Sequence, residues 1–196
     1  MYLRPSVTVT VLVSLALTAW TGIVHADDPI ASLNRSIQDR FKDVDKFFGV
    51  RRIVVIGDSP HQFKPENVTE LAAVQGLRDG GLRVALYVAG RRVLDQEPDL
   101  TTKEPFGLNR RVIFGPVVVT DPELPPGLPG PVDLIAESRM AFRTLVKRDR
   151  HDFELGEWKF TARAVRAATS QCLSCHRGRQ IGDPLGVVLY AYRPRG

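Results

Sequence analysis

Two segments near the C-terminus decide the fold, Glu157–Ala164 (EWKFTARA) and Leu185–Tyr192 (LGVVLYAY). In the first segment the apolar residues Trp158, Phe160, Ala162 and Ala164 alternate with Lys159, Thr161 and Arg163. Alternation with a period of two places the apolar side chains on one face, which predicts a half-buried strand. The second segment is nearly all apolar and follows the turn signal Gly182-Asp183-Pro184, so we predict a buried strand there.

Further strands are expected upstream of these two. They are Arg51–Gly57, Leu82–Ala89, Arg91–Leu94 and Arg110–Thr120, most of them rich in β-branched residues. A tight turn at Gly90 is predicted to join the second of these strands to the third, and Gly115-Pro116 interrupts the fourth. Strands that are joined by short turns favour an antiparallel sheet.

Three segments have the spacing of amphipathic helices. The first runs from Ile30 to Phe48 with Asp27 or Asp28 as its cap, the second from Pro65 to Asp79 with Gly80-Gly81 as its end, and the third from Val132 to Arg148. Between the second and third helices, Asp121–Pro131 contains five prolines and two glycines, which exclude helix and interior strand. The sequence therefore predicts an α+β fold with an antiparallel sheet flanked by helices, divided into two halves by the loop 121–131.

The N-terminus has the features of a secretory signal peptide, Met1–Ala26. Arg4 precedes an apolar stretch from Val7 to Trp20, and the small residues of Val24-His25-Ala26 provide a cleavage site. We expect cleavage after Ala26, export to the periplasm, and a mature chain in which residues 27–196 form one α+β domain. No apolar run in the mature chain is long enough for a membrane span.

The charge of the chain argues against one class of partner and favours another. The formal net charge is +5, and no block of Lys and Arg is long enough to follow a phosphate backbone, so we expect no nucleic-acid binding. Basic side chains gather instead between Arg139 and Arg179. This part of the protein is expected to present a positive potential to an acidic partner.

Both cysteines of the chain lie in one pentapeptide, Cys172-Leu173-Ser174-Cys175-His176. Two thiols three positions apart can each bond to a vinyl group of the same haem, and the adjacent imidazole can then ligate the iron. The pattern therefore predicts covalent attachment of one haem c through Cys172 and Cys175, with His176 as the proximal iron ligand.

Three other uses of the two cysteines compete with this interpretation. A thioredoxin-like CxxC belongs after an early strand in a βαβ unit, whereas this motif lies near the C-terminus. A zinc site would need ligands beyond Cys172, Cys175 and His176. A structural disulfide would close a very small ring and leave His176 without a role. Thiol-disulfide chemistry is the strongest of the three, and it stays less favoured than haem attachment.

The remaining contacts of a haem are less well determined by the sequence. Arg177 and Arg179 follow the motif closely enough to meet the haem propionates, or they point into solvent. The candidates for a distal iron ligand are Met140, which falls on the polar face of its predicted helix, and the loop residues His61 and His151. An iron without a distal protein ligand is the further alternative.

With this motif the chain resembles the exported monohaem c-type cytochromes. Its C-terminal part is similar to the haem-c domains of PAS-like fold, in which a helix, a strand with an aromatic residue, CxxCH and a closing Gly-rich strand follow one another. Ala136–Leu145, Glu157–Val165, Cys172–His176 and Gly182–Tyr192 have this order here.

The resemblance implies a haem in a PAS-like pocket. It also implies either electron transfer, with an acidic redox partner, or redox or gas sensing through an open or displaceable sixth ligand. No catalytic constellation has motif spacing in the sequence, and we expect no enzymatic activity.

Overall fold

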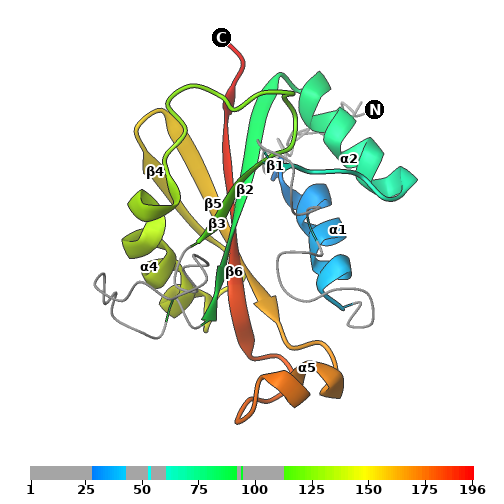
Figure 1. Ribbon diagram of the computed structural model, residues 1–196, viewed down its shortest axis with the longest axis vertical. Coiled ribbons are helices and arrows are strands. Elements are labelled where there is room, and N and C mark those ends of the chain that lie inside the picture. Colours follow the sequence, from blue (N-terminus) through cyan, green and yellow to red (C-terminus); the bar gives the residue numbers. More distant parts are fainter. Residues whose placement is uncertain (1–27, 43–52, 54–60, 92–93, 95–112) are drawn as a thin grey trace, which may run out of the picture.

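The computed structural model describes residues 28–42, 53, 61–91, 94 and 113–196, and the predicted signal peptide lies outside them. These residues build a mixed α+β structure around an open six-stranded sheet (Figure 1). The strands are β1 (His61–Gln62), β2 (Leu82–Gly90), β3 (Phe114–Val118), β4 (His151–Leu155), β5 (Trp158–Arg166) and β6 (Pro184–Pro194). The helices are α1 (Ala31–Lys42), α2 (Val68–Asp79), the 3-10 helix η2 (Pro131–Leu134), α4 (Ile135–Leu145) and α5 (Ser170–Cys175).

The strand order in the sheet is β1-β3-β2-β6-β5-β4. All neighbours are antiparallel except β1 and β3, which are parallel. The central pair is β2 with β6, in unbroken register from Leu82↔Pro194 to Gly90↔Gly186. The predicted class of fold is therefore confirmed, and strands from both sides of the proline-rich loop belong to one sheet.

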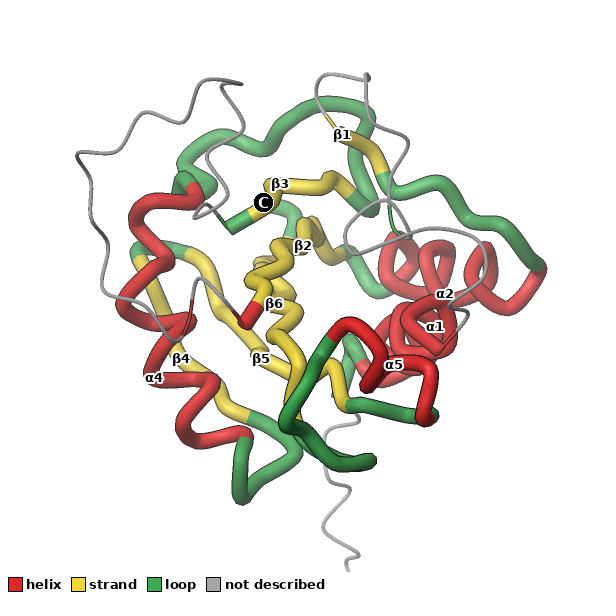
Figure 2. The backbone as a smooth tube through the Cα atoms, turned by 60° about the horizontal axis from the view of Figure 1, so that its bottom comes forward, coloured by secondary structure: helices red, strands yellow, loops and turns green. Residues whose placement is uncertain are grey.

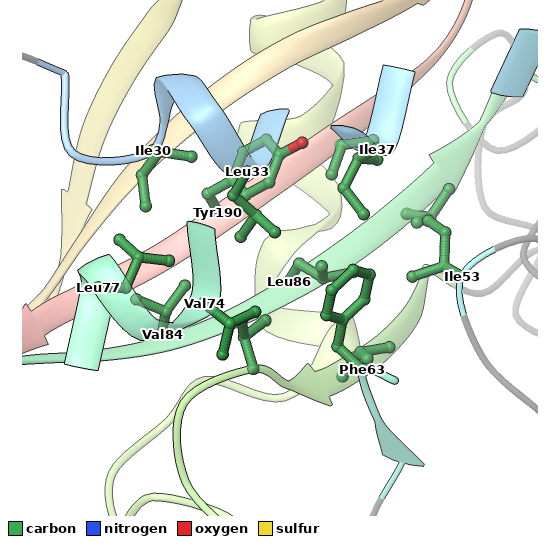
Figure 3. Close-up of a cluster of buried hydrophobic side chains, with 14 of the residues drawn as sticks. Ile30, Leu33, Ile37, Ile53, Phe63, Val74, Leu77, Val84, Leu86 and Tyr190 are labelled. Carbon is green, nitrogen blue, oxygen red and sulfur yellow. The ribbon is translucent and has the colours of Figure 1, made fainter. Parts of the chain in front are cut away.

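Helices cover both faces of this sheet. On one face, α1 and α2 pack on β2, β3 and β6, as Figures 1 and 3 show. The core there includes Ile30, Leu33, Ile37, Val74, Leu77, Val84, Leu86 and Tyr190. On the other face, α4 packs on β4, β5 and β6 with Leu134, Ala141, Phe142, Leu145, Trp158, Phe160 and Leu189. Burial on both faces explains why the sequences of β2 and β6 are almost continuously apolar.

The predicted cap Asp28 and the predicted stop at Gly80 are confirmed, whereas the second helix begins at Val68 and not at the expected Pro65. Asp28 accepts a hydrogen bond from the amide of Ile30 at 3.1 Å, next to the start of α1. Asn67 caps α2 by accepting from the amide of Glu70 at 2.9 Å, and Gly80 ends the helix. The expected extension of the first helix to Phe48 lies outside the described residues beyond Lys42.

A buried ion pair joins the two helices on this face. Arg40 of α1 donates from Nε to Oε1 of Glu70 at 2.7 Å and from Nη2 to Oε2 at 2.6 Å. The side chain of Arg40 is 8% exposed and that of Glu70 is 1% exposed. Arg40 also donates to the carbonyl of Lys64 at 2.7 Å and lies over the ring of Phe63. The same guanidinium therefore fixes α1, α2 and the segment that leads into α2.

Two sequence predictions about strands are wrong. Arg91–Leu94 is not a strand at its described residues, because Arg91 and Leu94 are helical and Gly90 pairs with Gly186 instead of turning. His151, which we expected in a loop, instead begins the strand β4. Its sequence HDFEL alternates partly buried His151, Phe153 and Leu155 with exposed acidic residues. Of the strand expected over Arg51–Gly57, only the buried Ile53 lies within the described residues.

The proline-rich loop is held against the sheet by its carbonyl groups. The hydroxyl of Tyr87 donates to Pro129 O at 2.6 Å, and Gln62 Nε2 donates to Pro122 O at 2.6 Å. Burial, together with the nearby Asp133, raises the pKa of Tyr87 well above its ordinary value, so the donor keeps its proton. Proline removes backbone donors and leaves carbonyls, which explains why side-chain donors fix this loop.

Gly115 in β3 is a position where we expect a side chain to be costly. Its φ is +134°, and an added Cβ would lie 2.8 Å from the ring of Tyr87 and 2.9 Å from the carbonyl oxygen of Leu86. Gly115→Ala should therefore lower the free energy of unfolding by about 1–3 kcal/mol in urea denaturation. Gly76→Ala in α2 is the control, since nothing lies within 4 Å of its Cβ, and it should stabilise the helix by up to about 1 kcal/mol. Equal effects of the two substitutions would contradict this account of Gly115.

Candidate functional site

The cysteine motif lies on a loop whose base is closed by backbone hydrogen bonds. The loop connects β5 to β6 and projects beyond the end of the sheet, with α5 at its tip (Figures 1 and 2). At its base, Ala167 N donates to Asp183 O at 2.9 Å and Gly182 N donates to Ala167 O at 2.8 Å. Arg166 reinforces the base by donating to Gly182 O at 3.1 Å and to Leu145 O at 2.8 Å. The ends of the motif-bearing segment are therefore fixed to both the sheet and α4.

The helix α5 places the two thiols on one side of a single turn. It begins after Thr169 and contains both cysteines, and none of its residues is buried. Residues three apart are neighbours on a helix surface, so Cys172 and Cys175 lie close together. They are not joined by a disulfide; Cys172 is partly exposed, with Sγ 3.6 Å from Thr169 Oγ1, and Cys175 is exposed. Two accessible thiols on one turn suit addition to a planar group that approaches from outside.

His176 ends the helix directly after the second cysteine. Its amide donates to Cys172 O at 3.2 Å, and its backbone angles of φ −102° and ψ 63° take the chain out of the helix. The imidazole is exposed. The motif therefore presents two thiols and one imidazole from the same turn, all accessible from solvent.

The two arginines after the motif differ in exposure. Arg177 is exposed, whereas Arg179 is partly buried. Both lie on the same loop as His176, just before the turn in which Gln180 N donates to Asp183 Oδ2 at 3.0 Å. Their place next to the motif is the one that the sequence predicts, and their contact with propionates stays a prediction.

The three distal-ligand candidates lie on three other elements. Met140 is on α4 and is 52% exposed, in agreement with its expected place opposite the apolar stripe. His61 is in the edge strand β1, stacked on Phe114 with ring centroids 4.9 Å apart, rather than in a turn. His151 begins β4 at the opposite edge of the sheet, 5.9 Å from the ring of Phe153. The fold thus distributes these candidates over separate elements and places none of them on the motif loop.

A cleft of about 290 Å³ lies where the motif loop leaves the sheet. It is lined by Asn34, Gln38, Lys42, Asp149, Arg163, Ala164, Arg166 and Ala168. Gln38 Nε2 bridges it by donating to Ala164 O at 3.0 Å. Sequence patterns do not indicate this cleft, because its residues come from α1, from β5 and from the turn before β4.

Much of the positive charge expected between Arg139 and Arg179 is already paired. Arg163 donates to the carboxylate of Asp28, and Arg150 donates from Nε to Asp152 at 2.6 Å. The guanidinium of Arg166 donates hydrogen bonds to three backbone carbonyls. Exposed cations of this region include Arg143, Lys147, Arg148 and Arg177. A positive surface near the motif loop is therefore narrower than the sequence count predicts.

Among the described residues, no group of three or more His, Cys, Asp or Glu side chains is placed to hold a metal ion. Within the same ranges, no helix has the length and apolar character needed to cross a membrane. No family model matches the sequence, and no curated protein or solved structure matches it.

Proposed function

We propose that this protein is an exported, periplasmic monohaem c-type cytochrome that transfers electrons through one covalently bound haem. The observation that carries the proposal is the position of Cys172, Cys175 and His176 on one exposed helical turn of a loop closed at its base. Attachment needs two thiols that a maturation system can reach and an imidazole next to them. The exposed turn provides all three groups.

The residues of the loop fit a covalent haem at the level of attachment. Cys172 and Cys175 would hold the porphyrin, and His176 would ligate the iron from the proximal side. A bound haem supplies one-electron redox chemistry. The chain supplies orientation, because Ala167, Asp183 and Arg166 fix the two ends of the loop to the sheet and to α4.

The order of elements supports the proposed kinship with haem-c domains of PAS-like fold. The helix α4, the strand β5, the motif helix α5 and the strand β6 occur in the order that the resemblance implies, with the additional strand β4 between α4 and β5. The same resemblance implies that the exposed cations near the loop, such as Arg177 and Arg148, dock an acidic redox partner. Contacts of this kind are transient and depend on ionic strength.

The test is a spectrum of the whole chain, exported together with haem-c maturation proteins. The absorption of haem should stay with the polypeptide after denaturation, and the native ferrous form should be low-spin and unchanged by carbon monoxide. Colourless protein, or haem that separates on denaturation, would overturn the proposal. Thiol-disulfide chemistry would then be the favoured function of the two cysteines.

A haem-based redox or gas sensor is the second candidate. The observation that favours it is the dispersal of Met140, His61 and His151 over α4, β1 and β4, since an iron without one of these ligands keeps an open or displaceable sixth position. In that case the covalent haem should be high-spin and should bind carbon monoxide readily. Met140→Ala, His61→Ala and His151→Ala should then leave the absorption spectrum unchanged.

A further inference from the structure

A second cleft, of about 380 Å³, lies at the end of the sheet opposite to the motif loop. It is lined by Arg83, Glu157, Arg193, Pro194 and Gly196. The strand β6 starts beside the loop of α5 and ends at this cleft, so the length of the sheet separates the two sites (Figure 1). The volume lies within the range of small-molecule sites, roughly 300–1,000 Å³.

Two arginines face each other across the central strand pair in this cleft. Arg83 of β2 is directly opposite Arg193 of β6 in the antiparallel register. Residues that are directly opposite in such a pair have their side chains on the same face of the sheet. Like charges in this position repel each other and destabilise the pairing unless an anion compensates them.

Neighbouring groups compensate the positive charge of Arg193. Arg193 donates from Nη1 to Glu157 Oε2 at 2.5 Å and from Nη2 to Pro126 O at 3.1 Å. Its guanidinium also lies 4.7 Å from the ring centroid of the buried Trp158. These contacts hold Arg193 in place, and the exposed Glu157 balances part of its positive charge.

Arg83 lacks the corresponding compensation. Its Nε atom is shielded from solvent and has no hydrogen-bond acceptor among the described residues. A shielded donor without an acceptor carries a desolvation penalty that the fold does not recover. An anion in the cleft, bound by the terminal N–H groups of Arg83, would give this guanidinium the counter-charge that it lacks and would reduce the repulsion between Arg83 and Arg193.

We propose that this cleft binds a small ligand through an oxyanion, a carboxylate or phosphate group that Arg83 holds with support from Arg193. The planar guanidinium matches both anions, because two of its N–H groups can donate to two oxygens of one anion. The site is independent of haem attachment, since it shares no residue with the motif loop. Its failure would therefore leave the proposed cytochrome function untouched, and the reverse also holds.

The experiment measures thermal unfolding of the mature chain with increasing inorganic phosphate or succinate, at constant ionic strength set with chloride. One of the two anions should raise the Tm in a saturable way, and the preferred anion identifies the group. Arg83→Gln should weaken the apparent affinity at least tenfold. Without either anion, Arg83→Gln should unfold at the same or a higher temperature than the wild type, because it removes the like-charge pair.

Lys159→Gln is the matched control. It removes the same charge from the neighbouring strand β5, where Lys159 is exposed and alternates with the buried Trp158 on the opposite face. Lys159→Gln should keep the wild-type response to the anion. The proposal is overturned if neither anion shifts the wild type saturably, or if Arg83→Gln and Lys159→Gln respond alike.

Discussion

Replacing both motif cysteines, Cys172→Ala with Cys175→Ala, is expected to abolish covalent haem. The thioether bonds need both sulfur atoms, and the chain holds no other cysteine. After export with haem-c maturation proteins and denaturation, the haem absorbance that stays with the polypeptide should fall to background. Each single substitution should lower it strongly, because one thioether bond is lost. His176→Ala should retain attached haem with a changed spectrum, since the iron loses its proximal ligand.

The position of the motif makes these variants informative. No residue of α5 is buried, so the substitutions should change the unfolding free energy of the apoprotein by less than about 0.5 kcal/mol. Ser174→Ala is the control on the same turn. Its hydroxyl donates to Gln171 O at 2.7 Å and to Cys175 Sγ at 3.8 Å, and because it cannot form a thioether bond, the variant should keep wild-type haem content. Full haem retention in the double cysteine variant would contradict the assignment of the motif.

Glu70→Gln is expected to be the most damaging single substitution at the interface of α1 with α2. Removing one partner of a buried ion pair leaves the other charge without compensation, which costs about 3–5 kcal/mol. Here the remaining charge is Arg40, whose side chain is only 8% exposed. Arg40 keeps an ion pair with the exposed Glu66 at 3.5 Å, so we expect a loss at the lower end of this range. A domain of ordinary stability has roughly 5–15 kcal/mol in total, so a large share would be lost. The Tm should fall by about 2–4 °C for each kcal/mol.

Asp39→Asn provides the matched control for this prediction. Asp39 pairs with Lys42 at 2.7 Å on the same helix, but both side chains are more than half exposed. Exposed pairs contribute about 0–1 kcal/mol, so this variant should be close to the wild type. Similar losses in Glu70→Gln and Asp39→Asn would contradict the role assigned to burial.

The same ion pair predicts how stability depends on pH. Burial disfavours the charged form of Glu70. The hydrogen bond and the charge of Arg40, together with the hydrogen bond that the amide of Glu66 donates, outweigh burial and lower the pKa of Glu70 below its ordinary value of 4.5. A carboxylate with a lowered pKa in the folded state stabilises the fold above its unfolded pKa. This stabilisation should be lost as the pH falls below about 4.5. In Glu70→Gln, urea denaturation should show a correspondingly smaller loss over the same range.

The sequence predicts the parts of the fold that depend on local patterns. Alternation in Trp158–Ala164, the apolar run of Leu185–Tyr192, the cap Asp28 and the stop at Gly80 all predict features that the structure contains. Periodicity and capping act within one or two turns of chain, so a single sequence records them. The prediction failed for Arg91–Leu94, because Gly90 pairs with Gly186 far along the chain, and no local signal encodes that partner.

The candidate site likewise has a part that depends on local sequence and a part that depends on tertiary packing. Cys172, Cys175 and His176 lie within one pentapeptide, and the prediction of haem attachment rests on that spacing alone. The exposed turn that carries these residues and the closed base of its loop were not predictable, because Arg166, Leu145 and Gly182 meet only after β5, α4 and β6 have packed.

By itself, the sequence determined the chemistry that adjacent residues can perform and the class of the fold. Only the tertiary structure decided which distant residues became neighbours. It placed Arg83 opposite Arg193, buried Arg40 with Glu70, and spread Met140, His61 and His151 over three elements. The physical reason is that strand register and helix packing are fixed by burial summed over the whole core, and not by the residues next to each site.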